Sequence, residues 1–197
     1  MNINCSNNQV NQCTGCGICA IVCPNKCISI IKNNNGFFEA SVDEFNCSNC
    51  GLCTKFCYKF FNDTFENFTP LSVYACWSRD EELLKACSSG GFATILARSY
   101  IEKGYNICGV LYDYKNEICK HKIAKQYEDL FEFIGSKYLQ SYTFEAFSKF
   151  KPNEKYIVFG SPCQILGLRK YIKFKKIENN FILVDFYCHG VPSYNLW

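Results

Sequence analysis

The feature that most constrains this chain is a run of four cysteines that occurs twice with identical spacing. Every cysteine of the first run has a counterpart 34 residues later: Cys13, Cys16, Cys19 and Cys23 are followed by Cys47, Cys50, Cys53 and Cys57. The intervening residues repeat as well, since Cys-Gly-Ile-Cys at 16–19 is matched by Cys-Gly-Leu-Cys at 50–53. A repeat with one constant offset indicates two copies of a single small unit.

Each run has the form Cys-x-x-Cys-x-x-Cys-x-x-x-Cys, which is the spacing of bacterial ferredoxins that hold two 4Fe-4S clusters. The three closely spaced thiolates of a run reach one cluster, and its fourth cysteine reaches the other. The predicted ligand sets are therefore Cys13, Cys16, Cys19 and Cys57 for one cluster, and Cys47, Cys50, Cys53 and Cys23 for the second. Glycines after Cys16 and Cys50 should let the backbone turn close to the cluster. Zinc is the alternative metal, but its sites use pairs of close cysteines rather than runs of four.

The number of cysteines and the net charge limit the class to which this protein can belong. The chain has 16 cysteines in 197 residues, a density typical of either disulfide-rich secreted domains or metal-binding proteins. Residues 1–5 do not resemble a signal peptide, and we find no apolar run long enough for a membrane span, so a cytoplasmic protein is expected. Cys27 is expected to pack and Cys5 to have no task. The formal charge of +3 is small and dispersed, which argues against a nucleic-acid partner.

The order of predicted elements indicates two domains, at 1–68 and 69–197. Apolar runs at 28–31 and 36–40 flank three asparagines and predict a hairpin, so the first domain is expected to be an α+β ferredoxin-like fold with two clusters. Polar residues at 62–70, ending in Pro70, suggest the boundary. Strands are then predicted at 71–77, 105–112, 156–159 and 181–187, with helices at 79–86, 92–103, 126–134, 144–150 and 163–171. This alternation predicts an α/β domain with a mainly parallel sheet, which we expect to be incomplete at its C-terminal end.

Three segments of the second domain carry possible chemistry. Ser88-Ser89-Gly90-Gly91 precedes a predicted helix and suits a phosphate or pyrophosphate, although such turns are often plain helix caps. Cys163 stands at the start of another helix, where its thiolate is favoured, as a redox thiol or a ligand of an additional cluster. Cys188 and His189 follow the last strand. The other histidine, His121, lies between lysines and is expected to be exposed.

Taken together, these motifs resemble the beta subunit family of coenzyme F420 hydrogenases and dehydrogenases. The resemblance rests on 88–91, on Gly-Ser-Lys-Tyr-Leu-Gln-Ser at 135–141, on Gly-Ser-Pro-Cys-Gln at 160–164 with Gly-Leu-Arg at 167–169, and on Cys-His-Gly-Val-Pro-Ser at 188–193. It implies a flavoprotein, with FAD, that passes electrons between flavin and iron–sulfur clusters. The flavin contacts that it implies are Ser88, Ser89, Gly90, Gly91, Thr94, Ser136 and Lys137.

The expected function is thus an oxidoreductase, or a subunit of one, in which two 4Fe-4S clusters exchange electrons with a flavin. Its partners would be a redox protein or subunit and a small-molecule hydride carrier. Catalytic candidates are Cys163, Lys137 and His189. Two alternatives are an electron-carrier module without catalysis of its own, and disulfide chemistry at Cys163 and Cys188.

Overall fold

The computed structural model describes residues 4–5, 13–60 and 72–197, so the predicted boundary at 62–70 lies outside the described residues. The N-terminal unit contains two short helices, a hairpin and a 3-10 turn: α1 (Ile18–Val22), β1 (Ile28–Lys32), β2 (Phe38–Val42), α2 (Leu52–Phe56) and η1 (Tyr58–Phe60). The predicted hairpin is confirmed, because β1 and β2 pair antiparallel with Ile28 opposite Val42. Its turn is closed by the Asn33 side chain, which accepts hydrogen bonds from the amides of Asn35 and Phe37, both at 3.0 Å.

The second unit is built on five strands in the order β5-β4-β3-β6-β7. The strands are β3 (Asn106–Asp113), β4 (Ile118–Ala124), β5 (Ser141–Tyr142), β6 (Tyr156–Phe159) and β7 (Phe181–Val184). The pairs β4–β5, β3–β6 and β6–β7 are parallel, but β3 and β4 form an antiparallel hairpin. The prediction of a mainly parallel sheet is therefore confirmed in part, and the sheet is mixed.

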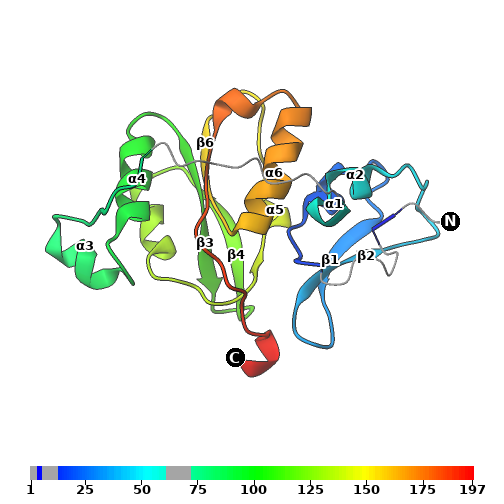
Figure 1. Cartoon of the computed structure of the whole chain (residues 1–197), viewed down its shortest axis with the longest axis horizontal. Coiled ribbons are helices and arrows are strands. Elements are labelled where there is room, and N and C mark those ends of the chain that lie inside the picture. The colour runs from blue at the N-terminus through cyan, green and yellow to red at the C-terminus, as the bar shows by residue number, and fades with distance from the viewer. Residues whose placement is uncertain (1–3, 6–12, 61–71) are drawn as a thin grey trace.

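Helices cover both faces of this sheet (Figure 1). They are α3 (Glu81–Ala86), α4 (Phe92–Ile101), α5 (Phe144–Phe147) and α6 (Pro162–Phe174), with 3-10 turns η2 (Tyr127–Phe133), η3 (Glu178–Asn180) and η4 (Tyr194–Leu196). Because neighbouring strand residues point to opposite faces, Ile107 and Ile157 pack with α4 and η2, whereas Cys108 and Val158 pack with α5 and α6.

Two predictions about the second domain are wrong. Residues 72–77 belong to neither sheet, although their apolar side chains suggest a strand; Val73, Tyr74 and Trp77 are exposed instead. His121 is buried with only 3% of its surface exposed. It lies on β4, where alternation turns Lys120 and Lys122 away from it toward Asp113 and Glu132. Flanking lysines therefore do not indicate exposure in a strand.

The N-terminal unit is joined to the second by a shared apolar core. Ile18 of α1 and Phe56 of α2 belong to the same buried cluster as Ile165 and Leu168 of α6. Ile18 has no exposed surface. In Figure 1, α6 lies between the sheet and the N-terminal unit, so the cysteine-rich unit packs against this helix.

Candidate functional site

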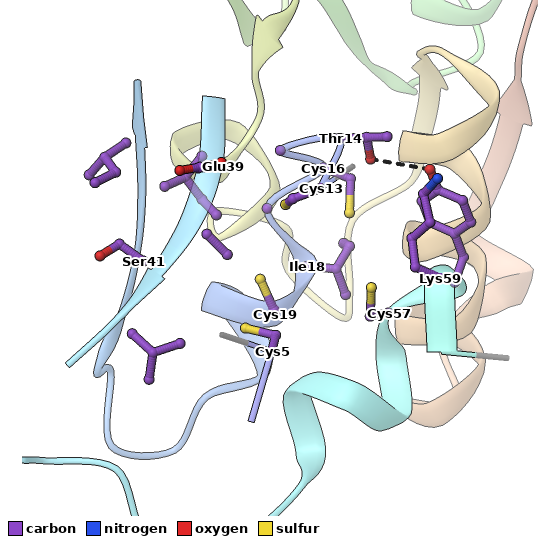
Figure 2. Close-up of a pocket in the computed structure, with 17 residues that line it drawn as sticks. Cys5, Cys13, Thr14, Cys16, Ile18, Cys19, Glu39, Ser41, Cys57 and Lys59 are labelled. Carbon is purple, nitrogen blue, oxygen red and sulfur yellow. Dashed lines mark hydrogen bonds between the residues drawn. The ribbon is translucent and has the colours of Figure 1, made fainter. Parts of the chain in front are cut away.

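Four of the repeat cysteines, together with Cys5, line a cavity of about 400 Å³ in the N-terminal unit. Three come from the first run and one from the second: Cys13, Cys16, Cys19 and Cys57. In Figure 2 the sulfur atoms of Cys16 and Cys57 point toward each other, Cys5 lies beside Cys19, and the Ile18 side chain stands between these two pairs in this view. Among the described residues, no three His, Cys, Asp or Glu side chains are close enough to hold a single metal ion. The spacing of the thiols therefore suits a group larger than a single metal ion.

The other four repeat cysteines line a second cavity: Cys23, Cys47, Cys50 and Cys53. Here again three residues come from one run and the fourth from the other. This cavity is much smaller, about 20 Å³, which is room for about one water molecule. Cys27 also lines it, with its sulfur 3.4 Å from that of Cys23. A cluster would fit here only if the lining residues moved apart.

The two short helices follow left-handed glycines that sit beside the cavities. Gly17 precedes α1 with φ 78° and Gly51 precedes α2 with φ 73°, a conformation that costs glycine little. A side chain on Gly17 would also collide with Thr143, because its Cβ would lie 2.5 Å from the hydroxyl oxygen. The glycines after Cys16 and Cys50 thus have a left-handed backbone conformation, and their approach to a cluster stays a prediction.

Burial changes the pKa of two thiols that line the first cavity. It raises the pKa of Cys16 to about 12 and also raises the pKa of Cys57. Iron binds thiolates, so binding a metal cluster here must release these protons. Cys5, for which the sequence suggests no task, lines this cavity, and hydrogen bonding to Cys19 raises its pKa.

The loop of the first cavity is held by the segment 135–143 of the second unit. The Gln140 side-chain amide donates to the carbonyl of Thr14 at 2.8 Å and to that of Phe38 at 2.9 Å, and its oxygen accepts from the Phe38 amide. The Thr143 hydroxyl donates to the Cys16 carbonyl at 2.9 Å. Sequence reasoning placed Gln140 in a family motif but not at this contact, because the contact spans more than 100 residues.

Helix α6 approaches the same loop through its N-terminal half. Ser161 and Gln164 cap it reciprocally, and the Ser161 hydroxyl lies 3.1 Å from the Cys163 sulfur. At Gly167 of this helix, an added Cβ would lie 3.5 Å from the Cys16 sulfur, so α6 packs closely against the first cysteine run. Cys188 is exposed, as is His189. Strands β6 and β7 are neighbours, but no contact joins Cys163 to Cys188 among the interactions of the described residues.

The structure brings together the two segments that the resemblance implicates in flavin binding. The Ser136 amide donates to the Ser88 hydroxyl oxygen at 2.8 Å, and both residues are exposed. Gly91 precedes α4 with φ 72°, and the Gly90 carbonyl accepts from the Ser78 amide. Thr94 lies on the first turn of α4, with its hydroxyl 4.0 Å from the Cys87 sulfur.

Lys137 is half-buried beside this pair of loops. Its ammonium group donates to the carbonyls of Ile134 at 2.8 Å and Glu132 at 3.3 Å. Burial lowers the pKa of Lys137. The cation therefore already has backbone partners, while Ser88, Ser89 and Ser136 present their hydroxyl groups at the surface.

The fold and the eight gathered thiols define the class as an iron–sulfur protein with a further α/β domain. Residues 12–59 match the model of the 4Fe-4S dicluster domain, and residues 153–197 match that of the C terminus of the coenzyme F420 hydrogenase/dehydrogenase beta subunit. The resemblance to that beta subunit family is thus confirmed. No curated protein has a significant match to the sequence.

Among solved structures, a chain of the F420-reducing NiFe hydrogenase complex from Methanosarcina barkeri is similar, with a TM-score of 0.53 and 25% sequence identity. The likeness covers 62% of this chain and 47% of the hydrogenase chain, so this chain spans about half of that relative. Within the described residues, none of the helices is both long enough and apolar enough to cross a membrane.

Proposed function

We propose that this chain is an electron-transferring subunit of an iron–sulfur flavoprotein oxidoreductase. The observation that carries the proposal is the grouping of the eight repeat cysteines into two sets of four, each with three members from one run and one from the other. That grouping is what cross-ligation of two 4Fe-4S clusters requires. Cys13, Cys16, Cys19 and Cys57 would hold the first cluster, and Cys47, Cys50, Cys53 and Cys23 the second.

The flavin site is proposed at the joined loops 88–91 and 135–137. Free amides at the start of α4 and the hydroxyl groups of Ser88 and Ser136 suit the phosphates of FAD. A flavin exchanges two electrons as hydride with a small carrier and releases them singly, as one-electron clusters need. Gln140 and Thr143 then serve to fix the first cluster loop to the segment that carries Ser136 and Lys137.

A second candidate function is an electron-carrier module without catalysis of its own. The observation that favours it is the Lys137 ammonium, which donates to two carbonyls of its own loop. A cation held in this way is less available to stabilise an anionic reduced flavin.

Iron and flavin analysis of protein purified without oxygen tests both functions. The first predicts about eight irons and one flavin per chain, the second about eight irons and no flavin. The substitution Ser88→Ala should weaken flavin binding and leave the iron content unchanged, with the exposed Ser148→Ala as the matched control. Full flavin occupancy in Ser88→Ala would rule out the proposed flavin site. Absence of iron from the unaltered protein would rule out both proposed functions.

A further inference from the structure

The basic residues of this chain are concentrated rather than dispersed. Two segments, 52–60 and 162–178, contain seven Lys or Arg and one Glu, a net charge of +6. The whole chain carries only +3, so everything outside these segments sums to −3. From the small net charge we expected the charged residues to be dispersed over the surface. The fold corrects this expectation, because the two basic segments meet in space.

The two segments form one surface, since α2 and η1 both pack against α6. We call this surface the basic face; its exposed members are Lys55, Lys59, Arg169, Lys173, Lys175 and Lys176. Arg169 and Lys173 lie one turn apart on α6, each next in the chain to a buried residue, Leu168 and Ile172, and Lys175 and Lys176 follow the end of the helix. In the described part of the chain, none of these six cations takes part in an ion pair.

An exposed aromatic ring stands within the basic face. Phe174 is 54% exposed, and the Lys55 ammonium lies 5.9 Å from its centroid. A large apolar side chain within a charged rim is the usual arrangement of a protein docking site. The ring also makes an edge contact with buried Phe56, at 5.1 Å between centroids, and Phe56 directly precedes Cys57.

The basic face therefore adjoins the first cysteine cavity. Cys57 lies between Lys55 and Lys59 in the chain and lines that cavity. Electron exchange between proteins requires that their redox centres come close, so a docking site beside one cluster loop is well placed. Unpaired lysines also attract an acidic partner over a distance and raise its association rate.

We propose that the basic face docks an acidic protein that carries a one-electron centre, and this rests on the function proposed above. The positive rim would orient the partner, and Phe174 would provide apolar contact at its centre. One electron passes between the partner and the loaded chain, so the partner changes its oxidation state by one and no bond is made or broken.

The test uses the cluster-loaded chain and, as probe, a small acidic bacterial ferredoxin. The rate of electron exchange is measured by stopped-flow absorbance from about 20 mM to about 500 mM salt. The double variant Lys55→Glu/Lys173→Glu should slow exchange about tenfold or more at low salt, and the difference should vanish at high salt because exposed charges are then screened. The matched control is Lys103→Glu/Lys115→Glu, which changes the charge equally at exposed lysines outside the basic face.

Iron content and reduction by dithionite must be equal in all variants, which shows that the clusters are intact. Equal rates in the two double variants, or no dependence on salt, would overturn the proposal. So would binding of duplex DNA that depends on Lys55 and Lys173 while the ferredoxin rate does not. If the chain held no clusters, the proposed function would fail, yet calorimetric titration with the oxidised ferredoxin would still decide whether the basic face docks it.

Discussion

At the scale of single residues, the fourth cysteine of each run decides how the clusters are shared. Cys57 lines the cavity of Cys13, Cys16 and Cys19, and Cys23 lines the cavity of the other run. Pairs of substitutions can separate this cross-ligation from ligation within each run, because the two schemes assign Cys57 to different clusters.

We predict that Cys13→Ala/Cys57→Ala loses one cluster and keeps about four irons per chain, whereas Cys47→Ala/Cys57→Ala loses both. Iron analysis and electron paramagnetic resonance of the reduced protein measure this. Cys27→Ser is the control, and should keep both clusters. Retention of about four irons by the Cys47/Cys57 variant and loss of all iron by the Cys13/Cys57 variant would establish ligation within each run.

His121 is a buried titratable residue that lines neither of the two cysteine cavities. Its ring contacts Phe147, its Nε2 lies 3.1 Å from the Phe159 carbonyl oxygen, and its buried Nδ1 has no hydrogen-bond partner among the described residues. Burial lowers the pKa of His121 from 6.5 to about 4. The unfolded chain therefore binds a proton between these values that the folded chain does not, and stability falls as the pH falls through this window.

From this shift we expect His121 to remove about 2 kcal/mol of stability between pH 7 and pH 5. Urea unfolding at several pH values measures it as the difference between the unaltered chain and His121→Phe, in which this part of the pH dependence should be absent. His189→Gln is the matched control, because His189 is exposed. Identical pH profiles for the unaltered chain and His121→Phe would contradict the prediction.

At the scale of elements, the start of α1 depends on a close approach between the two units. Gly17 and Gly104 both have φ 78°, but within the described part of the chain only Gly17 of this pair has a neighbour within 4 Å of the position of an added Cβ. The pair therefore separates the cost of the left-handed backbone from the cost of the contact with Thr143.

We predict that Gly104→Ala lowers the free energy of unfolding by about 1 kcal/mol, from the backbone alone. Gly17→Ala should cost about 2–4 kcal/mol, since it also displaces the Thr143 hydroxyl from the Cys16 carbonyl. Urea unfolding followed by circular dichroism measures both. Adding Thr143→Ala to Gly17→Ala should cost less than the sum of the single changes, because it removes the atom that collides. Additive costs would show that the collision does not matter.

At the scale of the whole molecule, the cysteine-rich unit is not an independent body on a flexible link. It shares an apolar cluster with α6, and Gln140 and Thr143 hold its first loop. A third connection comes from the C-terminal segment, where the Tyr194 amide donates to the Gly36 carbonyl at 3.1 Å and the Asn195 side chain donates to the Asn34 carbonyl at 2.9 Å. These contacts suggest that both units unfold together.

For this reason Ile18→Ala should destabilise both units by about 2–5 kcal/mol, as loss of a fully buried isoleucine does. Cluster absorbance and the circular dichroism of the α/β domain should lose their signals at the same urea concentration. The control is Ile31→Ala, where the side chain is 47% exposed and the cost should stay below about 1 kcal/mol. Two separate transitions, with only the first shifted by Ile18→Ala, would contradict a shared core.

The sequence by itself determined the local features of this protein. The cysteine repeat, the glycines before α1 and α2, the hairpin at 28–42 and the strand at 156–159 follow from spacing and periodicity within a few residues. Residues 72–77 and His121 misled the same reasoning, because whether an apolar segment pairs, or a strand residue is covered, depends on distant neighbours.

The tertiary structure alone decided which residues meet across long separations. It placed Gln140 on the carbonyl of Thr14, Ser88 beside Ser136, and the lysines of α2 and α6 on one face. None of these pairs leaves a signal in local sequence, because a hydrogen bond or a summed charge between segments more than 30 residues apart depends on how the chain folds back. The sequence determines which cysteines and lysines are present, and packing against α6 determines which of them lie close together in space.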